Sequence, residues 1–367
     1  MRNSELNASC HKPSISIIFM NEPSTPIWKQ QGLKYYRLNC FYKQLFGNST
    51  WKVSVDAGCQ CPNWRVDVTQ SNSECGISQT VHNASSQLAT CNSQLRGCIF
   101  CDSVSFSPSR RMEAGDIISQ IEAGIAQLNK RYKAQQFIAY FQPNTNTYGD
   151  LSVLQKFWET AISHPKVVGL IIGTRPDCVD NDVLTVLGEL AQKKWTSLEL
   201  GVQSLHDSTL KIINRGHDSA CAIDAIHRAK RVKGLHVGTH IILGLPNETP
   251  EMMNKTAQRL AQTPIDAVKI HNIYIARNTV LEQWYNRGLF TPPTRQEYIS
   301  MAADFIERMP ENVVIDRISA SVPAPYLVAP DWCSDSSGIL IDLENEFSRR
   351  SSQQGSRFTT DSSDKVN

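Results

Sequence analysis

Short runs of β-branched and other apolar residues recur along the chain and predict strands. In the run from Val167 to Ile172, apolar residues occupy almost every position. Such a continuous run is typical of a strand that is covered on both faces, as in a parallel sheet. The predicted strands cover residues 51–55, 137–141, 167–172, 197–200, 236–243, 267–270 and 313–315.

Between these runs, apolar residues recur at intervals of three and four, which is the period of an amphipathic helix. Examples are Ile117, Ile121 and Ile125, and the same spacing recurs in 183–190, 223–229 and 298–309, the last of which we expect to be the final long helix. Thr249-Pro250 predicts a helix start, with a capping hydroxyl and a proline in the first turn.

Strands that alternate with helices predict right-handed crossovers and a parallel sheet. At least six such units follow one another, so we expect a sheet that closes or curls toward closure as a TIM-like barrel. A doubly wound open sheet stays an alternative. In both architectures, functional side chains are expected at the C-terminal ends of the strands.

The polar segments of the chain predict its organisation. Residues 1–30 show no steady period and are expected to be poorly ordered, and residues 31–347 are expected to form one domain. Residues 66–96 are rich in Ser, Asn, Gln and Thr and predict an inserted polar loop, and residues 348–367 predict a disordered polar tail.

The overall charge and hydropathy bear on two classes of partner, and a tRNA partner stays possible but is not favoured. A formal net charge of +2 gives no global field that attracts nucleic acid. No apolar run approaches the roughly 20 residues that span a bilayer, so we expect no membrane association and a cytoplasmic location. The chain has 11 cysteines, and in a reducing compartment such cysteines are more often metal ligands or buried thiols than disulfides.

Six of the cysteines fall between Cys59 and Cys101, which indicates a metal site. Cys98-Ile99-Phe100-Cys101 places two thiolates close together, and Cys61 follows the first predicted strand, where the mouth of a barrel is expected. Phe100, between the two ligands, is a candidate to pack on an adenine. Spacing alone does not separate a [4Fe–4S] cluster from a four-thiolate zinc site that includes Cys59.

Polar residues at successive strand ends favour a ligand pocket over a purely structural metal. Glu199 and Gln203 alternate at the end of the fourth predicted strand, and Arg215 offers a guanidinium to a carboxylate. Further candidates are Thr174-Arg175-Pro176-Asp177 and the glycine of Gly244-Leu245-Pro246. His217, His240 and His271 either line the mouth of the barrel and act there or are ordinary packed histidines. Cys178 is a candidate hydrogen-atom donor.

Taken in order, these segments resemble radical SAM enzymes. The chain is similar to the YhcC-like subgroup and to the radical domain of the Elongator catalytic subunit, from about residue 33 to about residue 345. The matching segments are Cys61-Pro62-Asn63, Gly97 to Cys101, Tyr140-Phe141-Gln142, Gly173 to Cys178, Glu199 to Ser204, Asn214 to His217, Gly244-Leu245-Pro246, Lys269-Ile270-His271 and Arg317 to Ala320.

The resemblance implies a partial (β/α)6 barrel that cleaves S-adenosylmethionine reductively to a 5′-deoxyadenosyl radical. It implies Cys61, Cys98 and Cys101 as ligands of one [4Fe–4S] cluster, and an electron donor such as flavodoxin or ferredoxin as partner. It also implies S-adenosylmethionine contacts from Gln142, Glu199, Gln203 and Arg215. The alternative function is a zinc-stabilised TIM-like scaffold or binding protein without radical chemistry.

Two questions stay open at the level of sequence. The 36 residues between Cys61 and Cys98 are more than this family usually has, so Cys59, Cys75 or Cys91 could replace Cys61 or bind a second metal. The substrate is not indicated: the related Elongator domain acts on tRNA, but the near-neutral charge of this chain does not favour RNA.

Overall fold

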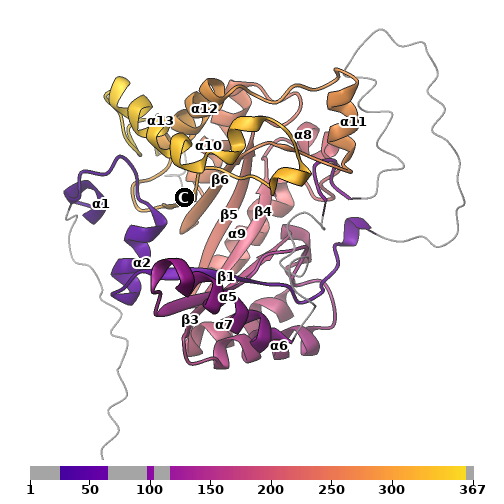
Figure 1. Cartoon of the computed structure of the whole chain (residues 1–367), viewed down its shortest axis with the longest axis vertical. Coiled ribbons are helices and arrows are strands. Elements are labelled where there is room, and N and C mark those ends of the chain that lie inside the picture. The colour runs from indigo at the N-terminus through magenta and orange to yellow at the C-terminus, as the bar shows by residue number, and fades with distance from the viewer. Residues whose placement is uncertain (1–24, 65–96, 103–115, 361–367) are drawn as a thin grey trace, which may run out of the picture.

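The computed structural model describes residues 25–64, 97–102 and 116–360, and its centre is one curved parallel sheet (Figure 1). Seven parallel strands pair in the order β1-β2-β3-β4-β5-β6-β8, so the order in the sheet follows the order in the chain. They are β1 (Thr50–Val55), β2 (Gln136–Phe141), β3 (Val167–Thr174), β4 (Trp195–Gln203), β5 (Leu235–Leu243), β6 (Ala267–Asn272) and β8 (Val314–Arg317). The intervening β7 (Ile275–Ala276) pairs instead with β9 (Leu327–Ala329) in a small antiparallel sheet. Because the order never reverses, the doubly wound alternative is wrong, and the TIM-like partial barrel is confirmed with a seventh strand.

Helices surround the sheet and mostly cover its outer face (Figure 1). Within the described residues they are α1 (Ile27–Gln30), α2 (Leu38–Phe46), α5 (Ile117–Tyr132), α6 (Leu151–Ser163), α7 (Asn181–Lys193), α8 (Asp207–Ile212), α9 (Ser219–Lys230), α10 (Pro250–Ala261), α11 (Val280–Asn286), α12 (Arg295–Glu307) and α13 (Ser336–Arg349). The Thr249 hydroxyl caps α10 by accepting a hydrogen bond from the Met252 amide, as the sequence predicts. None of these helices has the length and apolar character that crossing a bilayer requires.

Alternating residues of each strand face the helices and the barrel interior. In β2, Phe137 and Phe141 belong to the main apolar core with the helices, whereas Ile138 and Tyr140 pack in a separate cluster inside the barrel. Burial on both faces explains why the strands read as continuous apolar runs.

The seam between β1 and β8 has no strand pairing within the described part of the chain. Instead α2 contacts both strands, and the residue before it, Arg37, forms a parallel bridge with Ile315 of β8. Inside the barrel, the Lys52 ammonium of β1 lies 2.7 Å from the Asp316 carboxylate of β8. The barrel is therefore closed here by a helix and a buried ion pair.

Both expectations about the chain ends are wrong in part. The indole of Trp28, in α1, is 1% exposed and donates a hydrogen bond to the Glu311 carbonyl. Beyond α13, Gln354 is fully buried, and its amide donates to the carbonyls of Pro310 and Val313. These long-range hydrogen bonds order a segment whose composition suggests disorder. Residues 1–24, 66–96 and 361–367, where the other predicted loop and tail segments fall, lie outside the described residues.

Charged hydrogen bonds at the end of α13 allow the contribution of the C-terminal segment to stability to be tested. Glu346 is 4% exposed and accepts hydrogen bonds from Arg349 and Arg350, which lower the pKa of its carboxyl to about 2. Glu346→Gln is expected to cost about 1–3 kcal/mol of unfolding free energy at pH 7, because charged hydrogen bonds are lost. A carboxyl whose pKa is depressed stabilises the fold above its ordinary pKa of 4.5 and loses this effect as the pH falls toward 2.

Urea unfolding of both proteins at pH 7 and near pH 4 measures this effect. The difference between the wild-type and variant proteins should shrink at the lower pH. Glu159→Gln is the matched control, because Glu159 is 41% exposed in its pair with Lys193, and it should change the unfolding free energy by less than about 0.5 kcal/mol. An equal loss in both variants would contradict the assignment.

Candidate active site

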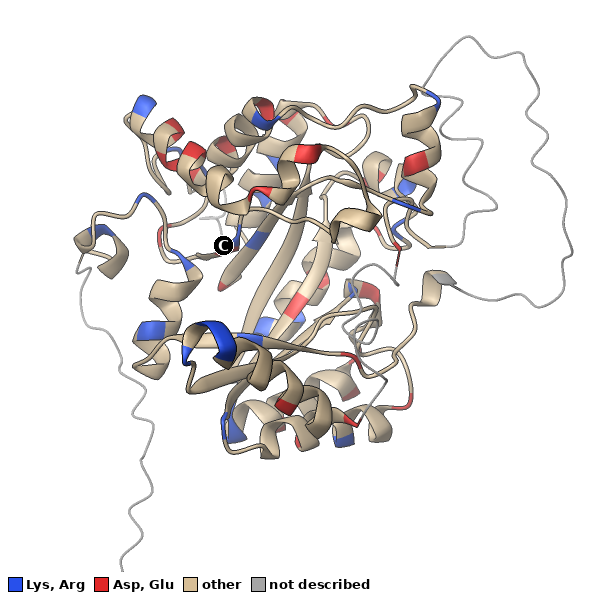
Figure 2. Ribbon diagram, in the orientation of Figure 1, with Lys and Arg blue, Asp and Glu red and all other residues tan. Residues whose placement is uncertain are grey.

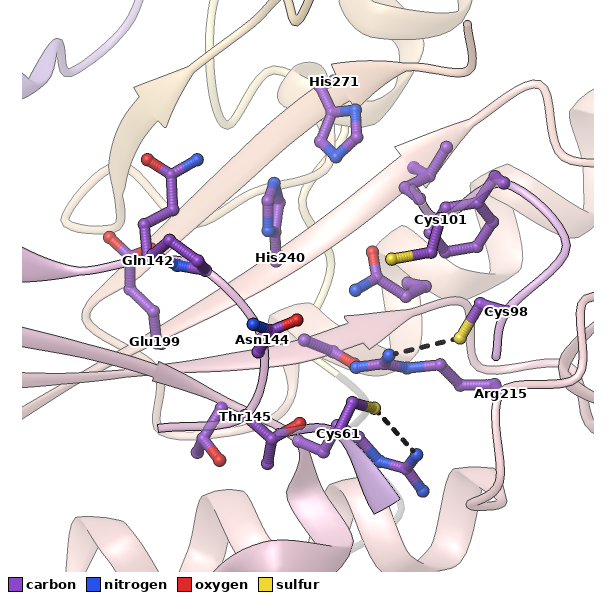
Figure 3. Close-up of a pocket in the computed structure, with 18 of the residues that line it drawn as sticks. Cys61, Cys98, Cys101, Gln142, Asn144, Thr145, Glu199, Arg215, His240 and His271 are labelled. Carbon is purple, nitrogen blue, oxygen red and sulfur yellow. Dashed lines mark hydrogen bonds between the residues drawn. The ribbon is translucent and has the colours of Figure 1, made fainter. Parts of the chain in front are cut away.

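A cavity of about 200 Å³ opens at the C-terminal ends of the strands, where barrel chemistry is expected. Its lining includes the predicted metal ligands and cofactor contacts, namely Cys61, Cys98, Phe100, Cys101, Gln142, Glu199, Gln203 and Arg215. It also includes Asn144, Thr145, Tyr274 and Arg317, which were not among the predicted site residues. Figure 3 labels the three cysteines, Gln142, Glu199 and Arg215.

The loop with Cys98 and Cys101 is held by backbone hydrogen bonds to the segment after α8. The Ile99 amide donates to the Ile213 carbonyl, and the Asn214 side chain donates to the Gly97 carbonyl at 2.7 Å. Asn63, two residues after Cys61, donates to the Asn214 carbonyl at 2.8 Å. One polar segment therefore fixes both cysteine groups, although they are distant in sequence.

Each of two cysteine thiols faces a guanidinium. Arg175 Nη1 lies 3.7 Å from Cys61 Sγ, and Arg215 Nη1 lies 3.7 Å from Cys98 Sγ (Figure 3). Each guanidinium places a positive charge beside a sulfur that carries negative charge when it binds a metal. Burial, followed by the neighbouring Cys98 and Cys61, raises the pKa of Cys101 above its ordinary value, so this thiol must lose its proton when it binds a metal.

Three cysteines among the described residues line the cavity and are its candidate metal ligands. Zinc needs all its ligands within about 2.3 Å of one atom, and no group of three or more His, Cys, Asp or Glu side chains in the described residues has this arrangement. Cys59 packs against the main apolar core and does not line the cavity, and burial followed by Asp56 raises the pKa of its thiol to about 11. Cys75 and Cys91 lie outside the described residues.

Gln203 ends β4 in a conformation that suits a ligand contact. Its φ of 68° is in the left-handed region, at a point where the register with β5 shifts. Its side-chain oxygen is buried and has no hydrogen-bond partner among the described residues. Strain and an unsatisfied polar atom together are typical of a binding site.

Gly201 allows Arg215 to lie against β4. A Cβ at this position would be 2.5 Å from Arg215 Nη2, and both Nε and Nη2 of Arg215 donate to the Gly201 carbonyl. Arg215 Nε also lies 3.1 Å from His217 Nε2, and burial followed by the Arg215 charge lowers the pKa of His217 to about 4. Much of the Arg215 guanidinium is therefore already bound within the protein. Neither His217 nor Cys178 lines the cavity.

Glu199 lies deeper, in a buried ionic network. Its Oε2 accepts from the Tyr140 hydroxyl at 2.7 Å and lies 3.0 Å from Lys269 Nζ, while Oε1 lies 3.4 Å from Lys52 Nζ. Burial alone would raise the pKa of Glu199, but the charges of Lys269 and Lys52 hold it well below its ordinary value. Glu199 lines the cavity, yet both of its oxygens have partners in the protein.

The loop after β2 is fixed by Asn146, which is fully buried. Its side chain donates to the carbonyls of Phe141, Pro143 and Gly173 at 2.9–3.0 Å. This anchor presents the preceding residues to the cavity, including Gln142 and Asn144 (Figure 3).

Comparison with known proteins agrees with this site. Residues 90–260 match the model of the radical SAM superfamily, and residues 265–349 match the radical SAM C-terminal domain. The chain belongs to the radical SAM superfamily and is a radical SAM enzyme, a class for which the family implies an iron–sulfur cluster and S-adenosylmethionine. The superfamily match includes Cys98 and Cys101, whereas Cys61 precedes it.

Among individual proteins, the chain is 36% identical to protein YhcC of Escherichia coli, over 68% of this chain and 79% of that protein. It is 29% identical to the uncharacterised protein YtqA of Bacillus subtilis, over 89% of this chain and 93% of that protein. A solved structure of Elp3 from the archaeon Methanocaldococcus infernus matches with a TM-score of 0.56 and 25% identity, covering 68% of this chain and 62% of that one.

Proposed function

We propose that this chain binds one [4Fe–4S] cluster through Cys61, Cys98 and Cys101 and cleaves S-adenosylmethionine reductively. The observation that supports this is the convergence of three cysteines from two distant segments on one cavity at the strand ends. When bound, the cluster and S-adenosylmethionine supply a 5′-deoxyadenosyl radical, which acts on a substrate that is still unknown.

The residues around the cysteines have three tasks in this proposal. Arg175 and Arg215 offset the negative charge of the bound thiolates, from 3.7 Å. Gln203 offers its unpartnered oxygen as an acceptor for a hydroxyl or ammonium group, and Gln142 lines the same cavity. Phe100 is half-buried and provides an apolar face for the adenine, which excludes water from the reacting atoms.

In this proposal Glu199 acts mainly through its neighbours. Since both of its oxygens are held, it positions Tyr140 at the cavity wall, and its contact with S-adenosylmethionine is secondary. Arg215 likewise acts mainly by offsetting the charge of Cys98, and its binding of a ligand carboxylate is secondary.

An enzyme of this family needs an electron donor, and we propose a flavodoxin or ferredoxin in the cytoplasm, where the thiols stay reduced. A tRNA substrate, suggested by the likeness to Elp3, is not favoured. Figure 2 shows Lys and Arg residues interspersed with Asp and Glu residues over the helices, whereas RNA binding usually requires a basic face.

Anaerobic reconstitution tests the proposal. Roughly four irons and four sulfides per chain, and 5′-deoxyadenosine after addition of dithionite and S-adenosylmethionine, are the expected results. Roughly eight irons would indicate a second cluster on the remaining cysteines. A tightly bound zinc, with neither iron nor product, would overturn the proposal.

A further inference from the structure

One wall of the cavity is not used by the proposed cleavage of S-adenosylmethionine. It is formed by the ends of β5, β6 and β8 and includes His240, His271 and Arg317. In Figure 3, His271 lies at the opposite end of the view from Cys61.

Arg317 is the unusual residue in this wall. It is half-buried, and its Nε is fully buried without a hydrogen-bond partner among the described residues. The nearby carboxylates are already paired, Asp316 with Lys52 and Glu199 with Lys269. A partly buried guanidinium without a carboxylate costs folding free energy, so its presence indicates a ligand that is an anion.

Two histidines add hydrogen-bonding atoms beside this cation. The rings of His240 and His271 have centroids 4.5 Å apart. His271 Nδ1 lies 3.0 Å from the Asn272 carbonyl, so it donates there and leaves Nε2 unprotonated as an acceptor. His240 Nε2 is buried without a partner among the described residues.

We propose that this wall is the substrate subsite and that it binds a substrate group that is a carboxylate or a phosphate. Arg317 binds the anion, and His240 and His271 hydrogen-bond the polar group next to it. The cavity has a volume of about 200 Å³ and opens at the strand ends, and its lining includes Arg317 and both histidines. This inference rests on the proposed function, because it takes the cysteine side of the cavity as the place of the cofactor.

The first test is stability, measured on the full chain as purified. Arg317→Met keeps the length of the side chain and removes the unpaired charge, so Tm is expected to rise by about 2 °C or more. Arg350→Met is the matched control: Arg350 pairs with Asp304 and Glu346 at 2.6–3.0 Å, and its loss should lower Tm. A fall in Tm for both variants would show that Arg317 is structural and would overturn the proposal.

The second test is anion binding at constant ionic strength. Tens of millimolar inorganic phosphate or succinate should raise Tm of the wild-type protein and leave Arg317→Met unchanged. A response to phosphate alone identifies a phosphate ester as the substrate group, and a response to succinate alone identifies a carboxylate. Equal responses of both proteins, or no response of the wild-type protein to either anion, would overturn the proposal.

The methionyl carboxylate of S-adenosylmethionine is the other carboxylate that Arg317 can bind. Equilibrium dialysis with S-adenosylmethionine on the reconstituted protein distinguishes it from a substrate carboxylate. If Arg317→Met loses S-adenosylmethionine binding, the anion is the methionyl carboxylate and the substrate subsite is wrong. Failure of the proposed function is a different result, since wild-type protein would then lack iron and form no 5′-deoxyadenosine.

Discussion

Cys98→Ala and Cys101→Ala are each expected to abolish the iron–sulfur absorbance and all formation of 5′-deoxyadenosine. A cluster held by only two protein thiolates is open to solvent and is lost during purification. Cys61→Ala should have the same effect, although Cys61 comes from a different segment, because its thiol lines the same cavity and faces Arg175. Iron content, visible absorbance and product formation after anaerobic reconstitution measure the effect.

The controls use the other cysteines of the same region. Cys59→Ala should retain iron and activity, because Cys59 packs against the apolar core and does not line the cavity. Cys75→Ala and Cys91→Ala are also expected to retain both. Loss of the cluster in one of these three variants, with retention in Cys61→Ala, would assign the first ligand to that cysteine.

Most of the fold could be predicted because a strand buried on both faces reads directly as an apolar run. All seven predicted runs lie within or overlap the strands of the sheet. The last helix, α13, was missed, although Ile339, Leu343 and Phe347 repeat every four residues and are fully buried. The Ser-rich residues that follow α13 suggested disorder and hid the helical pattern before them. These residues are ordered by hydrogen bonds from Gln354 to carbonyls that are distant in the sequence.

The site was predictable where chemistry is local in sequence, and less so where it depends on packing. The Cys98–Cys101 spacing and the polar end of β4 indicated the cavity. The sequence could not predict that Glu199 and Arg215 already have partners within the protein. Those partners depend on how β1, β6 and the segment after α8 pack in the folded chain. Tyr274 and Arg317 both lie at or just beyond strand ends, and the same rule that identified Gln203 would have found them.

Lys269→Met is expected to lower the unfolding free energy by about 3–5 kcal/mol, because it leaves a buried carboxylate with one cation fewer. Lys269 is 4% exposed, and its ammonium lies 3.0 Å from Glu199 and 2.7 Å from the Tyr140 hydroxyl. These contacts join β6 to β2 and β4 through the barrel interior, and Lys52 extends the network across the seam between β1 and β8 to Asp316. The loss should appear as a Tm lower by about 6 °C or more.

A double variant separates loss of the ionic network from loss of packing. In Lys269→Met combined with Glu199→Gln, the uncompensated carboxylate is gone, so the double variant should be more stable than the sum of the single losses predicts, by about 1 kcal/mol or more. Lys193→Met is the surface control, since its pair with Glu159 is 54% and 41% exposed, and it should shift stability by less than about 0.5 kcal/mol. Strict additivity would mean that the interior charges do not stabilise one another, and that only the packing of the lysine stem joins these strands beneath the cavity.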